Sequence, residues 1–255
     1  MTTNSICQGQ QVPALWPEIF RNGYEISFAQ TSFKWANLAN DIAGVTVAIV
    51  AISNVPRENK LIYSIGPNGA SVSKKSSNIN AYLVDGPDII VKKSSTPISQ
   101  LSNLDRGNGP VDGGGLIFSM DERNSLLKGG DPIFDHLYPF IGSSEFIDST
   151  TRYCLWLEDS QLGEIKDSPE SENRFRRVRD FRLGSDKLPT QKLANRPHSF
   201  SERRQPTLVP LVLVPKVSSE SRGLIPAGLY PAGTVVSDNA FAIHECALWE
   251  LAIVT

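Results

Sequence analysis

The first 53 residues combine one stretch of helical pattern with two apolar stretches of strand pattern. Residues 12–23 (VPALWPEIFRNG) predict a short helix, with a proline near its first turn and a glycine after its end. Residues 24–29 (YEISFA) predict a strand. Residues 43–53 (AGVTVAIVAIS) are β-branched and apolar on both faces, which is typical of a central strand that is covered on both sides. This part of the chain therefore looks like the end of an α/β sheet.

After a polar linker at 56–59, the chain predicts many short strands and few helices. Asn68-Gly69 supplies the turn of a predicted hairpin, and 105–115 is a glycine-rich loop. The other expected strands are bounded by turn residues and cover 60–65, 70–75, 78–84, 87–93, 151–158, 211–214, 234–237, 241–244 and 247–254. The fold class we expect is α+β, a mostly antiparallel, β-rich domain with short helices, preceded by the terminal strands of an α/β sheet.

Two helices are predicted in the second half of the chain by their capping residues. Ser119 precedes a helical stretch closed by Gly129, and Ser168 with Pro169 opens a helix that runs to about Leu183. The apolar stripe of the second helix is Phe175, Val178 and Phe181. At about 100° per residue, Arg176 and Arg179 fall opposite that stripe and Arg177 flanks it, whereas Arg174 falls within it.

Composition excludes some classes of protein. The 255 residues are 40% hydrophobic, the formal net charge is −2 and the pI is about 6.0, so the chain as a whole is not basic. Its three cysteines are far apart with no CxxC pair, which supports neither a zinc site nor a disulfide framework and favours the cytoplasm. We see no signal peptide and no apolar run long enough to span a membrane.

The sequence contains no complete active site. Residues 131–134 (DPIF) resemble the (N/D)PP(F/Y) motif of amino-methyltransferases, but the second proline is missing and no apolar strand precedes them. The glycines of 107–115 follow no strand and suit turns better than a dinucleotide site. The three histidines are too scattered for a metal site. We therefore expect no catalytic residue and no metal ligand in this chain.

Positive charge is concentrated between Arg174 and Arg204. This stretch contains ten arginines and lysines but three acidic residues. The acidic stretch 158–172 just before it hides this patch in the overall charge. Arginine suits two-pronged contacts to phosphate or guanine. The alternative for the helix arginines is a solvated face that pairs with the upstream acids. The loop arginines 196, 203, 204 and 222 cannot be explained by pairs within one helix.

Eight stretches, in order, resemble the MmeI-like family of type IIL restriction–modification enzymes. They are TTNSICQGQQVPALWPEIF, ISFAQTSFKWANLANDIAGVTVAIVAIS, INAYLVDGPDIIV, PVDGGGLIFS, GSSEFI, RYCLWLED, RPHSF and VPKVSSESRGLIPAGL. These enzymes carry nuclease, adenine methyltransferase and target-recognition functions on one polypeptide. The resemblance implies that residues 1–55 are the incomplete end of the methyltransferase domain and 56–255 the DNA target-recognition domain.

The resemblance also implies which partners and cofactor the protein has and which residues contact DNA. It implies double-stranded DNA and the rest of the methyltransferase/nuclease polypeptide as partners. S-adenosylmethionine would serve the complete enzyme, with its site upstream of Met1 and no cofactor in this chain. Expected base-reading residues are Arg196, Arg203, Arg204, Ser218, Ser219, Glu220 and Arg222, and expected backbone contacts are Arg176, Arg177, Arg179, Lys187 and Lys192.

Glu220 and Arg222 match an acid-x-Arg position that reads a base pair in the family. Two apart on an extended segment, they would face one groove and complement the two bases of a C·G pair; the alternative is an ion pair at a strand end. Phe33 and Trp35 would fall near the pocket for a flipped adenine, or would simply pack the sheet. Besides a DNA-recognition module, two functions remain: a methyltransferase subunit that needs a missing catalytic half, and an inactive decayed fragment.

Overall fold

The computed structural model describes residues 1–35, 44–66, 68–97, 100–205, 209–219 and 222–255, which fall into two compact units, 1–95 and 96–255. The first unit extends beyond the predicted division at residue 55, because strands after that point pair with strands before it. The assignment of 1–55 and 56–255 to a methyltransferase domain and a recognition domain stays a prediction.

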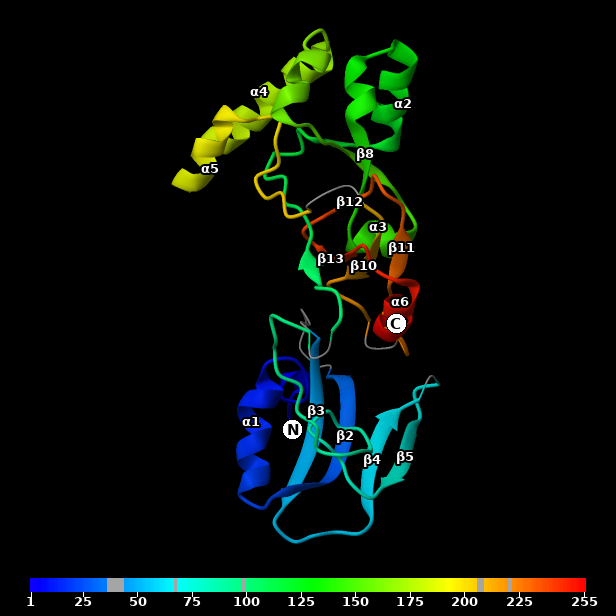
Figure 1. Ribbon diagram of the computed structural model, residues 1–255. Helices are drawn as coiled ribbons and strands as arrows, with labels where there is room; N and C mark the ends of the chain where they lie inside the picture. Colours follow the sequence, from blue (N-terminus) through cyan, green and yellow to red (C-terminus); the bar gives the residue numbers. More distant parts are fainter. Residues whose placement is uncertain (36–43, 67, 98–99, 206–208, 220–221) are drawn as a thin grey trace. The chain divides into compact units, whose positions relative to one another are not determined.

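The first unit is a five-stranded sheet with one helix on it (Figure 1). Its elements are β1 (Thr2–Thr3), the 3-10 helix η1 (Asn4–Cys7), α1 (Gln11–Arg21), β2 (Glu25–Trp35), β3 (Val45–Ser53), β4 (Lys60–Ile65) and β5 (Ser71–Ser76). The strand order is β1-β3-β2-β4-β5, in which only the β2–β4 pair is parallel. Helix α1 packs through Val12 and Trp16 against Ile26 and Ala48.

Three strand predictions in this unit have different outcomes. The predicted hairpin is confirmed as β4 and β5, with Gly69 at a positive φ of 77°. Strand β3 lies between β1 and β2 as expected, but it is not covered on both faces, since Val45 and Ile52 are nearly half exposed. The predicted strands 78–84 and 87–93 are wrong. There Ile79 forms only isolated bridges, to Ile26 and Asp85.

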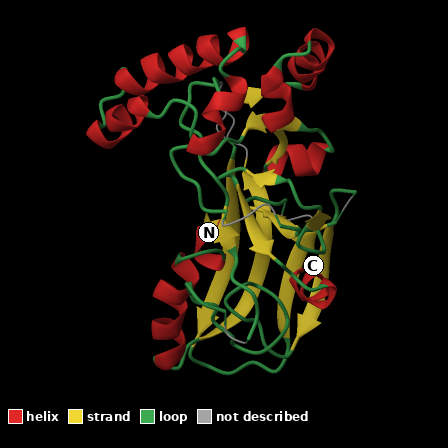
Figure 2. Ribbon diagram, turned by 45° about the horizontal axis from the view of Figure 1, so that its top comes forward, coloured by secondary structure: helices red, strands yellow, loops and turns green. Residues whose placement is uncertain are grey.

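The second unit contains two four-stranded sheets with short helices around them (Figure 2). One sheet has the order β11-β10-β13-β6 and is antiparallel. The other has the order β12-β8-β9-β7, with a parallel β12–β8 pair. The strands are β6 (Asp105–Arg106), β7 (Ile117–Phe118), β8 (Leu137–Ile141), β9 (Arg152–Leu155), β10 (Leu211–Pro215), β11 (Gly228–Tyr230), β12 (Val235–Val236) and β13 (Ala240–His244). This mixed architecture confirms the α+β fold class.

Two helices of the second unit, α2 (Met120–Gly129) and α4 (Pro169–Leu183), begin at the predicted capping residues. The other described helices of this unit are η2 (Pro132–His136), α3 (Ser143–Asp148), η3 (Asp159–Ile165), α5 (Leu188–Lys192), η4 (Leu193–Asn195) and α6 (Leu248–Val254). Ser119 and Glu122 form the capping box of α2, and Ser168 caps α4, as predicted.

The predicted strand 247–254 is wrong, because this stretch is helix α6. The carboxylate of Glu250 accepts hydrogen bonds from the backbone N–H groups of Ala247 and Ser102, at 2.9 and 2.8 Å. Leu251 and Val254 pack on a small core around Val212. The capping contact and this helical spacing of apolar contacts outweigh the apolar run that suggested a strand.

Candidate nucleic-acid interface

Helix α4 buries two arginines and exposes three. Its buried face is Ser171, Arg174, Val178 and Arg182. The predicted apolar stripe is therefore only partly correct. Val178 is buried and Phe175 packs against the core, but the side chain of Phe181 is 49% exposed. Arg174, which the sequence placed within the stripe, is indeed on the buried side.

Arg182 is fully buried and connects the helix to two loops. Its five guanidinium N–H groups donate to five backbone carbonyl oxygens, at distances of 2.7 to 3.0 Å. These acceptors belong to Pro110, Val111, Leu193, Arg196 and Ser199. Burial lowers the pKa of Arg182. Because every donor has an acceptor, the residue fixes the start of the 196–204 loop relative to α4.

Arg174 connects the same helix to α2. Its Nε donates to Glu170 and its Nη2 to Glu122, each at 2.6 Å, and Nη1 donates to the carbonyl oxygen of Ile117 at 2.8 Å. The guanidinium also lies 3.9 Å above the ring of Phe118. Helix α4 is thus held by two arginines, one toward the loops and one toward α2.

The expected backbone-contact residues on α4 are exposed, as are Lys187 and Lys192. Arg176 donates to the side-chain oxygen of Asn173 at 2.6 Å. Among the described residues, neither Arg177 nor Arg179 has an ion-pair partner. In α4 the proposed pairing with upstream acids holds only for Arg174, so an exposed face with three arginines remains.

Three of the loop arginines, Arg196, Arg203 and Arg204, are paired with carboxylates. Arg196 contacts Asp159 at 2.8 Å, Arg203 contacts Glu158 at 2.6 Å and Arg204 contacts Glu202 at 2.8 Å. Nε2 of His198 lies 2.7 Å from a carboxylate oxygen of Asp159, within hydrogen-bond distance. The hydrogen bonds from Arg196, and then from His198, hold the pKa of Asp159 below its usual range. These pairs orient the arginines and compete with any anion that would bind them.

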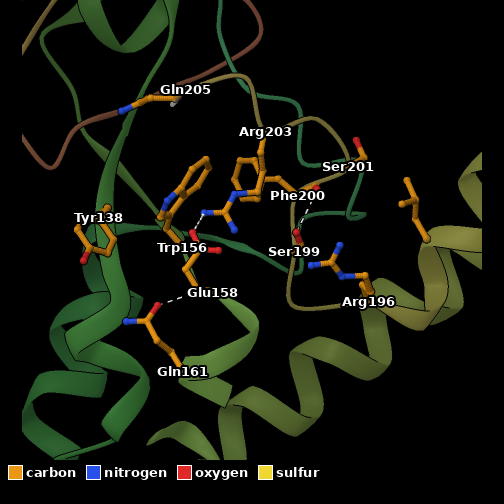
Figure 3. A pocket seen from close by; sticks show the side chains of 11 residues that line it. Tyr138, Trp156, Glu158, Gln161, Arg196, Ser199, Phe200, Ser201, Arg203 and Gln205 are labelled. Carbon is orange, nitrogen blue, oxygen red and sulfur yellow. Dashed lines mark hydrogen bonds and ion pairs between the residues drawn. The ribbon is translucent and has the colours of Figure 1, made fainter. Parts of the chain in front are cut away.

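A cavity of about 680 Å³ lies beside these arginines (Figure 3). Arg203 lies 4.1 Å above the ring of Trp156 and donates to the carbonyl oxygen of Leu157 at 2.8 Å. Trp156 in turn contacts Phe200 edge to face, with 5.3 Å between the ring centroids. Aromatic contacts and hydrogen bonds therefore fix one wall of the cavity, while Arg196 lines another part of it.

The segment after β10 is exposed. Ser218, Ser219 and Arg222 are all exposed, and Glu220 lies outside the described residues. The backbone N–H of Arg222 donates to the carbonyl oxygen of Ser219 at 3.1 Å. The expected extended segment from Glu220 to Arg222 runs through residues outside the described ranges, so it stays a prediction, as does the role of the Arg222 side chain.

The two aromatic residues expected near a flipped base lie on β2. Phe33 is half-buried and aligned with Val47, whereas the side chain of Trp35 is 47% exposed. Packing in the sheet accounts for the position of Phe33 better than for that of Trp35. Their part in a base pocket stays a prediction.

Several sequence motifs have structural roles. Asp131 of the DPIF motif caps η2 by accepting a hydrogen bond from the N–H of Ile133 at 3.0 Å. Gly9 and Gly23 have positive φ, and an added Cβ at either would meet no atom within 4 Å, so they are turn glycines.

Within the described ranges, no cluster of three or more His, Cys, Asp or Glu side chains is arranged to hold a metal ion. Over the same ranges, no helix has the length and apolar character needed to cross a membrane.

Comparison with known proteins defines first the class of this chain. Residues 1–64 match the sequence model of a DNA-methyltransferase domain, and residues 85–255 match that of a target recognition domain. Both models describe MmeI, and the chain belongs to this family. The resemblance found in the sequence is therefore confirmed.

One curated protein and one solved structure illustrate the relationship. DNA methyltransferase A of Bacillus subtilis (strain 168) is 39% identical over 254 residues, which are 99% of this chain and 28% of that protein. The structure of the type IIL restriction-modification enzyme MmeI in complex with DNA has a TM-score of 0.80 at 35% identity, covering 99% of this chain and 34% of that one. The chain thus spans about a third or less of these relatives.

Proposed function

We propose that this chain is a sequence-specific DNA-recognition module of an adenine-specific DNA methyltransferase with restriction–modification function. The observation that carries the proposal is Arg182, which holds the arginine-bearing helix α4 and the loop 196–204 in one arrangement. Phosphate contacts position a protein on DNA and base contacts specify the sequence. Helix α4 suits the first role, and the loops suit the second. A DNA partner agrees with the cytoplasmic localisation expected from the sequence.

The test is a selection from a randomised pool of DNA duplexes with the purified chain. We expect enrichment of one defined sequence, which then binds at least about a thousandfold more tightly than unrelated duplexes. Equal retention of all sequences would contradict the proposal, and so would a failure to retain any duplex. Unfolding curves recorded on the same preparation verify that the protein tested is folded.

The enzymatic part of the proposal concerns the complete polypeptide. S-adenosylmethionine would supply the methyl group there, and the rest of the methyltransferase/nuclease polypeptide would be the partner of this chain. We expect no methyl transfer by the chain alone, since its sequence shows neither a cofactor-binding glycine motif nor an (N/D)PP(F/Y) tetrapeptide. Incorporation of label from S-adenosylmethionine into DNA by the purified chain, above background, would show that it carries a catalytic site.

A further inference from the structure

Two cations in the second unit share one hydrogen-bond acceptor. Arg106, at the end of β6, donates through Nε to the backbone carbonyl oxygen of Asp238 at 3.3 Å. Lys216, directly after β10, donates through Nζ to the same oxygen atom. The two positive charges are therefore neighbours, although the residues that carry them are far apart in the sequence.

Arg204 adds a third cation to this group. Its Nη1 donates to the carbonyl oxygen of Gly107, the residue that follows Arg106, at 3.1 Å. Two carboxylates accompany the three cations. Asp238 contacts Arg106 at 3.3 Å, and Glu202 contacts Arg204 at 2.8 Å. Three positive and two negative charges leave an excess of one positive charge, which suits one singly charged anion.

The pKa of Lys216 reflects its burial and the repulsion from the neighbouring positive charge of Arg106. Burial, and next the charge of Arg106, lower the pKa of this lysine. The side chains of Arg106 and Arg204 are 50% and 34% exposed, so the group is open to solvent on one side. Like charges held together are destabilising unless an anion joins them, and such an arrangement is typical of a binding site.

The three cations are mounted on one rigid frame. Asn108 is buried, and its side-chain oxygen accepts hydrogen bonds from the backbone N–H groups of Arg204 and Gln205, at 2.7 and 3.1 Å. Its carbonyl oxygen accepts from the N–H of Asp238 at 2.9 Å. The hydroxyl of Ser143 accepts from the N–H of Lys216 at 3.1 Å. The backbone next to each cation is therefore fixed before any ligand binds.

We propose that Arg106, Arg204 and Lys216 bind a phosphodiester group of the DNA. In the sequence, Lys216 directly precedes the exposed Val217, Ser218 and Ser219, where the expected base-reading segment begins. The inference rests on the proposed DNA-recognition function and changes the expected contact of Arg204 from base to phosphate. A phosphate fixed at Lys216 would set the register of the exposed segment on the duplex, because backbone contacts position a protein without reading sequence.

The first experiment measures the salt dependence of binding to a short duplex that carries the selected sequence. The slope of log affinity against log salt is negative, and its magnitude decreases by roughly 0.9 for each phosphate that the protein no longer neutralises. We expect this decrease in Arg106→Gln and in Lys216→Met, and an unchanged slope in Lys216→Arg, which keeps the charge. The control is Lys93→Gln, which removes an exposed lysine in the first unit and should leave the slope unchanged.

The second experiment locates the phosphate. Duplexes in which one phosphate at a time is replaced by a neutral methylphosphonate are compared on the unaltered chain and on Lys216→Met. One replacement should weaken binding by the unaltered chain and have no further effect on the variant. A purely structural role of Lys216 would lower thermal stability and weaken binding to all these duplexes alike, and that result would overturn the inference.

Three further outcomes separate this inference from the proposed function. If the unaltered chain selects and binds a sequence while the Arg106 and Lys216 variants keep its affinity and slope, only the phosphate site is wrong. If inorganic phosphate competes with DNA no better than chloride of equal ionic strength, the site is selective for DNA, which supports the inference. If free phosphate binds at Lys216 without any effect of the variants on DNA binding, the site serves another anion and the inference fails.

Discussion

One terminal nitrogen of Arg196 donates to both carboxylate oxygens of Asp159, at 2.8 and 3.0 Å. Asp159 therefore competes with DNA for this guanidinium. In the variant Asp159→Asn we expect tighter binding to unrelated duplexes and a smaller ratio of specific to non-specific affinity, since a cation is released. Titration of both kinds of duplex measures the two affinities. A matched substitution, Asp148→Asn, removes an exposed carboxylate at the end of α3, and it should leave the ratio unchanged.

The exposed face of α4 predicts sequence-independent binding. The triple variant Arg176→Gln, Arg177→Gln and Arg179→Gln should flatten the salt dependence of binding by roughly 0.9 in slope for each phosphate that is no longer neutralised. The weakening should be similar for all duplexes, because phosphate contacts carry no sequence information. Binding isotherms at several salt concentrations test this. An unchanged slope would return this helix face to a merely solvated role.

Glu220 and Arg222 are expected to specify one base pair. Arg222→Ala should cost about 1–3 kcal/mol of binding free energy on the selected sequence and relax selectivity at one position only. The exchange of donor and acceptor, Glu220→Lys with Arg222→Asp, should shift the preference toward the reversed pair. Repeated selection from a randomised pool provides the measurement. If the exchanged variant keeps the original preference at every position, the two residues have a structural role.

Arg182 should be the arginine of α4 whose replacement most affects stability. In Arg182→Lys, three donors replace five, so at least two carbonyl oxygens lose the hydrogen bond that the guanidinium donates. Each such loss costs about 1–3 kcal/mol, and the free energy of unfolding should fall accordingly. Denaturant unfolding measures it. Arg179→Lys, on the exposed face of the same helix, is the control and should leave stability unchanged.

His244, at the end of β13, should make stability depend on pH. Burial lowers the pKa of His244, and its Nδ1 is buried without a hydrogen-bond partner in the described chain. The folded protein therefore binds the proton less well than the unfolded chain. Stability from neutral His244 is present above the unfolded pKa of about 6.5 and is lost as pH falls through the folded pKa. Unfolding at pH 8 and at pH 5.5 should show this loss, and His244→Gln should reduce it.

Local signals in the sequence predicted the elements best. Ser119 and Ser168 mark the starts of α2 and α4, because a capping hydrogen bond involves residues only three apart. Residues 247–254 resemble a strand in sequence because a short apolar run fits a strand and a buried helix equally well. The stretch 78–93 has the composition of strands, yet its described bridges are isolated ones, from Ile79 to Ile26 and to Asp85. Strand pairing depends on distant partners, which a single sequence does not show.

The candidate site was predicted in composition but not in arrangement. The arginines of 174–204 stand out in the sequence, and helical periodicity placed Arg176 and Arg179 on the exposed face. Arg182 was not recognised as buried, because its acceptors are backbone carbonyl oxygens that any sequence supplies. The group around Asp238 was missed for a similar reason. Arg106 and Lys216 meet only through the pairing of β6 and β10 with β13.

The buried strand β10 and the exposed segment after it tolerate substitutions to different degrees. Every residue of β10 is buried, whereas Val217, Ser218, Ser219 and Arg222 are exposed. Substitutions in the exposed segment remove no packing from the core, so natural selection can change them without unfolding the protein. If the segment reads bases as we propose, a lineage of such proteins can acquire new preferred targets in small steps, while the fold that carries the segment stays almost unchanged.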